Sequence, residues 1–364
     1  MMTNSFKYLV FLLIPALYLF PDLDYGQNTV VSLTSDTTSG YRDGGSSVAQ
    51  FKQPFGMCMD NAGNIYIADA GNNCIRKIST SGIVSTYAGN GIAGSIDGQA
   101  ANAQFNSPSG VCIDSSGNLY VADFQNHSIR KITSDGNVST IAGSGQPGYS
   151  DGFGTDAQFD YPRGICIDAS GVLYVSDSWN HRIRKITQDG NVTTFAGGGD
   201  SIGVDSQGEW TDAQDTSARF FTPCGLSIDN TGNIYVADAL NHRIRKIDGL
   251  GNVTTIAGSG DSGWNAGGFN DGQADSSKLN TPTELFVTNS GDVIFSDTYG
   301  NRIRKVSIDG FVSTIAGTGD AGLKNGDAST AQFNTPRGVV ADSSGSKIYV
   351  IDSKNNLIRV INLK

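Results

Sequence analysis

Residues 105–145 read FNSPSGVCIDSSGNLYVADFQNHSIRKITSDGNVSTIAGSG, and this stretch decides the fold. It holds four short runs rich in apolar and β-branched residues: GVCID, LYVAD, SIRKI and NVSTIAG. The segments between these runs contain Gly-Asn, Asp-x-x-Asn-His and Asp-Gly-Asn, which are residue types that form tight turns. The stretch therefore predicts four short antiparallel strands joined by turns.

The same four-strand unit repeats along the chain at nearly even spacing. Aligning the sequence on the pattern Phe/Leu-x-x-Pro gives six unit starts: Phe51, Phe105, Phe159, Phe220, Leu279 and Phe333. A four-stranded sheet exposes two apolar faces, so one unit cannot be stable alone and neighbouring units must stack. Radial stacking of such sheets gives a propeller. We therefore expect an all-β fold, a six-bladed β-propeller with four antiparallel strands per blade.

The two ends of the chain complement each other. The last unit stops after its third strand, LIRVINL at 357–363, and lacks a fourth. Near the other end, TVVSL at 29–33 precedes GYRDGGSSVAQF, which aligns without a gap with GYSDGFGTDAQF before Phe159. We expect the N-terminal strand to pair with the C-terminal blade and to close the ring, so that the propeller domain spans residues 28–364.

The third predicted strand carries the motif that suggests a family. NHRIRKI stands at 180–186 and 241–247, and NHSIRKI stands at 126–132; YVAD or YVSD precedes each of them. This pattern resembles the NHL repeat of bacterial secreted and receptor proteins and of animal teneurins. The resemblance covers essentially all of residues 28–364 and implies the propeller fold. It says little about function, because such propellers include binding modules, sensor domains and some enzymes.

Charge and composition argue against one class of partner. The 364 residues include 25 Lys and Arg against 35 Asp and Glu, which gives a net charge of −10. A nucleic-acid-binding domain needs a basic surface, and many of the cations here recur at one register of the third strand. We expect no nucleic-acid partner, and we expect a monomer.

The N-terminal segment has the pattern of an export signal. Lys7 precedes an apolar run at 8–20, which Pro15 interrupts. This run is shorter than the roughly 20 residues that a membrane span needs. We interpret residues 1–27 as a signal peptide, or as an N-terminal anchor if the segment stays uncleaved. The expected location is secreted, periplasmic or cell-surface, with membrane contact only through an uncleaved segment.

Several polar residues recur at fixed repeat positions, which favours structural roles. His127, His181 and His242 share one position in neighbouring units, and equivalent positions on stacked sheets lie about 10 Å apart, too far to share a metal ion. An Asp ending the second strand lies seven residues before an Arg in each unit, which predicts six ion pairs. Loop residues before each unit suggest turns rather than calcium sites: Asp43, Asp97, Asp151, Asp212, Asp271 and Asn325. We expect no metal and no cofactor.

The cysteines do not form a disulfide framework. Cys58, Cys112 and Cys166 occupy the same repeat position on one predicted strand. Adjacent sheets are about 10 Å apart, whereas a disulfide needs Cα atoms within about 7 Å. We expect free thiols.

Candidate binding residues lie where the repeats differ. The two longest inter-unit loops contain Trp210 and Trp264, and the shorter loops add Phe124, Trp179 and Tyr299. Exposed Trp and Tyr supply large contact areas at a small cost in entropy. The alternative interpretation is that these side chains pack beneath the long loops.

The fifth unit departs from the repeat. It reads Pro-Thr-Glu at 282–284, where the other units have Pro-x-Gly. Since the first strand borders the central channel, Glu284 is expected to face Arg163 and Arg337, which follow the equivalent prolines. Such an arrangement would suit a small polar ligand. A relaxed, degenerate repeat is the alternative.

Two functions follow from this pattern. The first is an extracytoplasmic scaffold that binds an extracellular protein, peptide or glycan through the loop face. The alternative is a metal-dependent propeller enzyme of lactonase or lyase type, with its site at the central channel. No Ser/His/Asp or Cys/His arrangement is visible, so the sequence predicts no catalytic residue. A structural envelope component is a third possibility.

Overall fold

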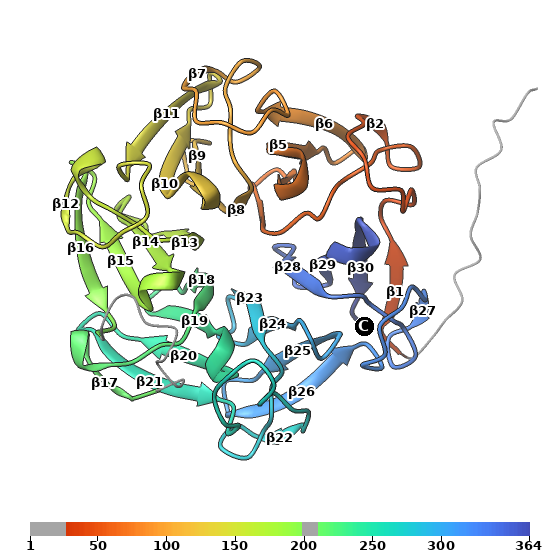
Figure 1. Cartoon of the computed structure of the whole chain (residues 1–364). Helices are drawn as coiled ribbons and strands as arrows, with labels where there is room; N and C mark the ends of the chain where they lie inside the picture. The colour runs from red at the N-terminus through yellow and green to blue at the C-terminus, as the bar shows by residue number, and fades with distance from the viewer. Residues whose placement is uncertain (1–26, 199–209) are drawn as a thin grey trace, which may run out of the picture.

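A computed structural model describes residues 27–198 and 210–364. Within these ranges the chain forms six antiparallel sheets of five strands each, arranged as blades around a central channel (Figure 1). No α-helix occurs in the described part of the chain, and none of its helical segments could span a membrane. The expectation of an all-β six-bladed propeller is confirmed. The predicted signal segment lies almost wholly outside the described residues.

The strands of each blade follow one another from the channel outward in the same order. Blade 1 has β3 (Met57–Met59), β4 (Ile65–Asp69), β5 (Cys74–Ile78), β6 (Ile83–Ala88) and β2 (Gly44–Gly45). Blade 2 has β8 (Pro108–Ile113), β9 (Leu119–Asp123), β10 (Ser128–Ile132), β11 (Asn137–Ala142) and β7 (Gly98–Gln99). Blade 3 has β13 (Pro162–Ile167), β14 (Leu173–Asp177), β15 (Arg182–Ile186), β16 (Asn191–Ala196) and β12 (Gly152–Phe153).

The other three blades follow the same order. Blade 4 has β18 (Pro223–Ile228), β19 (Ile234–Asp238), β20 (Arg243–Ile247), β21 (Asn252–Ala257) and β17 (Ala213–Gln214). Blade 5 has β23 (Pro282–Val287), β24 (Val293–Asp297), β25 (Arg302–Val306), β26 (Phe311–Ala316) and β22 (Gly272–Gln273). Blade 6 has β28 (Pro336–Ala341), β29 (Lys347–Asp352), β30 (Leu357–Asn362), β1 (Thr29–Ser32) and β27 (Gly326–Asp327).

The strand number per blade corrects the sequence prediction of four. A fifth strand of two residues comes from the loop before each unit and pairs with the outer edge of the fourth strand, as β7 pairs with β11. A two-residue strand is too short to produce an alternating pattern, so no signal for it is visible in the sequence. It covers the outer edge of each blade, where unpaired backbone groups would otherwise offer a pairing site.

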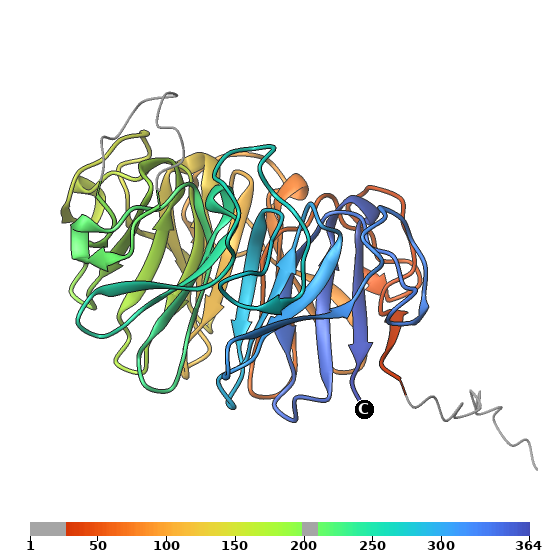
Figure 2. The same ribbon diagram turned by 90° about the horizontal axis from the view of Figure 1, so that it is seen from below.

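The ring closes as the sequence predicted. Strand β1 lies between β30 and β27, with Val30 opposite Ile361 on one side and Gly326 on the other. The C-terminus lies beside β1 in both views (Figures 1 and 2). The Val30 side chain is fully buried in the core of blade 6. Both chain ends therefore contribute to one blade.

The hydrophobic core lies between blades. One cluster joins Ala122 and Ile129 of blade 2 to Phe159, Ile165 and Val175 of blade 3, and five similar clusters complete the ring. Each blade thus buries its apolar faces only against its neighbours.

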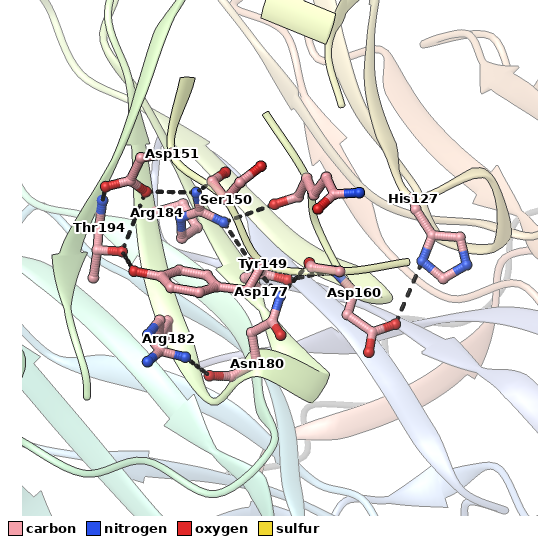
Figure 3. A network of polar contacts seen from close by, with 12 residues as sticks. His127, Tyr149, Ser150, Asp151, Asp160, Asp177, Asn180, Arg182, Arg184 and Thr194 are labelled. Carbon is pink, nitrogen blue, oxygen red and sulfur yellow. Dashed lines mark hydrogen bonds and ion pairs between the residues drawn. The ribbon is translucent and has the colours of Figure 1, made fainter. Parts of the chain in front are cut away.

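A buried arginine of the third strand ties each blade to the loop that precedes it. In blade 3, Arg184 Nη1 donates to Asp177 Oδ2 and Nη2 donates to Asp151 Oδ1, both at 2.7 Å (Figure 3). Burial raises the pKa of Asp177 to about 6, opposed by Arg184, so the carboxyl group is mostly ionised at pH 7.

The six predicted ion pairs are all present, at 2.7–2.9 Å: Asp69–Arg76, Asp123–Arg130, Asp177–Arg184, Asp238–Arg245, Asp297–Arg304 and Asp352–Arg359. The loop residues interpreted as turn formers bind the same six arginines: Asp43, Asp97, Asp151, Asp212, Asp271 and Asn325. We call each of these six arginines, together with its two side-chain partners, an arginine staple.

The residue directly before each third strand, which is His in three blades and Asn in the other three, connects neighbouring blades. Its side chain accepts a hydrogen bond from the backbone N–H of a residue in the next blade. The six pairs, acceptor first, are Asn73 and Ser107, His127 and Tyr161, His181 and Thr222, His242 and Thr281, Asn301 and Thr335, and Asn356 and Gln53. Burial lowers the pKa of all three histidines, which keeps their rings neutral and able to accept. These positions therefore hold the ring together.

The donors in these pairs have an unusual backbone. Each precedes the proline of an inner strand and has a positive φ, between 48° and 56°. A non-glycine residue in this conformation is strained and persists only where its surroundings hold it. The bond to the previous blade supplies that restraint at the channel mouth.

Candidate ligand-binding site

The residue after each inner-strand proline lines a cavity at one mouth of the central channel. The cavity has a volume of about 350 Å³. Proline precedes all six positions and glycine follows five of them, so the backbone repeats while most side chains differ. The six residues, which we call the mouth ring, are Phe55, Ser109, Arg163, Cys224, Thr283 and Arg337.

The wall of the cavity comes from the loops on the same face. The short turns between second and third strands contribute Phe124, Leu240 and Lys354, and Tyr299 occupies the same place in blade 5. The long loop before β22 contributes Trp264. The cavity is thus built from the parts of the blades that repeat least.

Five of the eight residues predicted from the sequence line this cavity: Phe124, Trp264, Tyr299, Arg163 and Arg337. Trp264 is 65% exposed and Tyr299 is 47% exposed. These two side chains therefore stand on the surface and are not packed beneath the loops.

Trp179 and Trp210 lie outside the cavity lining. The Trp179 ring is 54% exposed and lies 4.7 Å from Tyr161, whose ring lies 4.7 Å from Phe124. This stack connects the exposed face to the cavity wall. Trp210 is 43% exposed, and Arg243 lies 3.9 Å from its ring centre.

The two arginines of the mouth ring stack on aromatic rings. The Arg337 guanidinium lies 4.3 Å from the ring centre of Phe55, and Arg163 lies 5.7 Å from the same ring and 5.0 Å from Phe124. Arg163 Nη1 is 3.8 Å from the sulfur of Cys224. Its Nε atom is buried and has no hydrogen-bond partner among the described residues. Neither guanidinium forms an ion pair within 4 Å with a described carboxylate.

Glu284 lies one residue deeper than the mouth ring. Its side chain lines a second cavity of about 200 Å³ further down the channel. Burial raises the pKa of Glu284 to about 8, opposed by Arg337 and Arg163, so the carboxyl group is mostly neutral at pH 7. Its Oε1 atom is buried without a partner in the described part of the chain.

The glycines around Glu284 explain why the repeat uses glycine. A Cβ atom on Gly164 would lie 2.2 Å from the carbonyl oxygen of Cys224, and one on Gly225 would lie 2.6 Å from Glu284 Oε2. The strand register of blade 5 is the same as that of blade 3, because Leu285 stands opposite Phe295 as Ile165 stands opposite Val175. Blade 5 therefore accommodates a side chain without a change of register, and the Glu284 side chain rests against Gly225.

Most side chains that line the lower cavity are apolar. Cys58, Cys112 and Cys166 line it together with Met57 and Met59. All five cysteines of the chain are free, as predicted. Burial raises the pKa of Cys166 and its two equivalents, so these thiols stay protonated at pH 7.

The alternative enzyme function would need a set of metal ligands at the channel. Within residues 27–198 and 210–364, no three His, Cys, Asp or Glu side chains converge as a metal site. The three histidines are committed to the contacts between blades. The described residues therefore do not supply the ligands of such a metal centre.

Comparison with known protein families agrees with the repeat structure. The NHL repeat family matches residues 51–78, 105–132, 159–186 and 222–247. These segments cover the inner three strands of blades 1 to 4. This is an NHL-repeat β-propeller.

Relatives of the NHL-repeat propeller are longer proteins. Protein SUPPRESSOR OF QUENCHING 1 of Arabidopsis thaliana is 30% identical over 93% of this chain and 33% of its own length. NHL repeat-containing protein 2 of Homo sapiens is 28% identical over 82% of this chain and 45% of its own length. The chain thus spans a third to a half of these relatives.

Solved structures share the fold at low sequence identity. An auxiliary nutrient binding protein from Bacteroides thetaiotaomicron superposes with a TM-score of 0.69 at 18% identity, covering 92% of this chain and 76% of that protein. Virginiamycin B lyase from Staphylococcus aureus superposes with a TM-score of 0.55 at 14% identity, covering 93% and 99%. These similarities establish the propeller architecture.

Sequence reasoning missed part of the site. It did not single out Phe55, Cys224 or Lys354, which also line the upper cavity. A signal was available, because the residue after each proline varies between two nearly invariant neighbours. Comparing that position across all six units would have identified the mouth ring.

Proposed function

We propose that this NHL-repeat propeller is an extracytoplasmic binding protein that captures its ligand on the loop face. The single observation that carries the proposal is the cavity at the channel mouth, lined by residues that differ between blades. Structural repeats supply the scaffold, whereas differences between them supply specificity. The partner is an extracellular protein, peptide or glycan, and the part of it that is recognised enters the cavity.

Three further observations support a binding role. The exposed rings of Trp179, Trp264 and Tyr299 offer contact area on one face. The cavity volume falls in the range of small-molecule sites. A protein of the same fold is described as an auxiliary nutrient binding protein. The apolar run at 8–20 supports export, with residues 1–27 as the signal or anchor and residues 28–364 as the propeller.

The test is a double substitution, Trp179→Ala with Trp264→Ala, in a capture assay with extracellular material from the native surroundings. We expect capture to be lost while the melting curve is unchanged, because both side chains are more than half exposed and contribute little to the core. A matched control is Phe153→Ala, which removes an exposed aromatic side chain from the outer strand β12.

Unaltered capture by the double variant would remove this face from consideration. Equal loss in the Phe153→Ala control would show that the effect is not specific to the cavity face.

A further inference from the structure

The upper cavity is positively charged within a chain that is negatively charged overall. Arg163, Arg337 and Lys354 line it, and no Asp or Glu among the described residues does so. The whole chain has a net charge of −10. The local excess of cations is therefore a feature of this cavity and not of the molecular surface in general.

The two mouth-ring arginines have unused hydrogen-bonding capacity. Arg163 Nε is buried without a partner, and Arg337 makes no hydrogen bond or ion pair with a described residue. Arg184 Nε is also buried without a partner, but the Nη1 and Nη2 atoms of Arg184 bind two aspartates and two backbone carbonyl oxygens. Both mouth-ring side chains are partly buried, and a desolvated cation without a carboxylate partner lowers stability, so a bound anion would satisfy groups that the fold leaves free.

The nearest carboxyl group does not neutralise these arginines. Glu284 makes no ion pair with Arg163 or Arg337 within 4 Å, and its raised pKa of about 8 keeps most of it uncharged at pH 7. The positive charge in the cavity is therefore available to a ligand.

Aromatic side chains form part of the cavity wall, beside several Ser and Thr residues. Phe124, Tyr299 and Trp264 surround the cavity, together with the buried side chain of Leu240. Aromatic side chains of this kind bind planar unsaturated groups by stacking. Guanidinium groups bind carboxylates through paired, charge-assisted hydrogen bonds.

We propose that the cavity binds a small aromatic carboxylate, with the carboxylate on Arg163 and Arg337 and the ring against Phe124, Tyr299 and Trp264. This inference rests on the proposed binding function and specifies its ligand class. The carboxylate lies toward the channel and the ring lies toward the exposed loop face.

The test uses trans-cinnamate as the probe and the uncharged trans-cinnamamide as its matched analogue. Titration calorimetry at pH 6.5 should show cinnamate binding about 10-fold more tightly or better, because the amide cannot form the charge-assisted hydrogen bonds that the carboxylate accepts. Arg337→Met and Arg163→Met should abolish this preference. Arg337→Lys, which keeps the charge but not the paired geometry, should retain part of it.

The control variant is Arg42→Met, which removes an exposed arginine that does not line the cavity. Its cinnamate affinity should equal that of the wild type. Melting curves of all variants establish that each one is folded.

A second experiment measures how the affinity for cinnamate depends on pH. Arg163 on β13, Arg337 on β28 and Cys224 on β18 are the titratable groups that interact with Glu284. The thiols of Cys58, Cys112 and Cys166 share its cavity, and burial raises the pKa of each. Cinnamate affinity should fall as pH rises through about 8, because ionised Glu284 competes for the arginines. Glu284→Gln should remove this fall.

The outcomes separate the two proposals. Equal binding of cinnamate and cinnamamide, both weakened by Trp264→Ala, would overturn the carboxylate preference while leaving a ligand site at the channel mouth. Binding of neither probe at millimolar concentration would overturn this inference, whereas the proposed function is decided by the capture assay.

Discussion

Two sets of arginines in this propeller have opposite surroundings. The six staple arginines are fully buried, and each binds a buried Asp and a loop Asp or Asn. The two mouth-ring arginines, Arg163 and Arg337, stack on aromatic rings and have no carboxylate partner within 4 Å in the described residues. The comparison teaches that residues repeated in every blade hold the fold together. Residues that break the repeat are free to bind something else.

The largest effect is expected when the strand that closes the ring, β1, is removed. Deleting residues 28–34 removes β1, its pairing with four residues of β30 and the buried Val30 side chain. At about 1 kcal/mol per ladder hydrogen bond and about 1.5–3 kcal/mol for Val30, the loss is comparable to the stability of a whole domain.

We therefore expect aggregation or loss of the cooperative melting transition, measured by circular dichroism and size-exclusion chromatography. A chain that begins at Gln27 is the control and should melt normally. A monomeric deletion variant with an unchanged melting temperature would show that β1 does not close the ring.

A smaller effect is expected at a single staple. Arg184→Met leaves Asp177 buried without its cation, which should lower the free energy of unfolding by about 3–5 kcal/mol. Urea denaturation measures this change, and Arg42→Met provides an exposed control that should stay within about 0.5 kcal/mol of the wild type. A loss below about 1 kcal/mol for Arg184→Met would mean that the staple contributes little.

Most of the scaffold could be predicted because its signals repeat six times. The four strands, the closure and the Asp–Arg pairs all follow from periodic residues such as Asp177 and Arg184. Contacts between segments distant in sequence were harder to predict. The sequence indicated a structural role for His127, but not that its ring accepts a hydrogen bond from Tyr161 of the next blade.

The candidate site was predictable only in part, because the depth of a side chain along the channel is not visible in the sequence. Glu284 was expected at the channel mouth near Arg163 and Arg337, whereas it follows the mouth-ring position by one residue and its side chain lines the lower cavity. Trp210 was grouped with Trp264 because both lie in long loops, yet only Trp264 lines the upper cavity. Loop length gives no information about the direction in which a side chain points.

The central claim is that the mouth-ring arginines are kept for binding and not for stability. The most direct test is urea denaturation of the Arg163→Met, Arg337→Met double variant without ligand. Because each substitution replaces a partly buried cation that has no carboxylate partner, the account predicts a free energy of unfolding equal to or above that of the wild type. A decrease of more than about 1 kcal/mol would contradict it and would place these arginines with the staples.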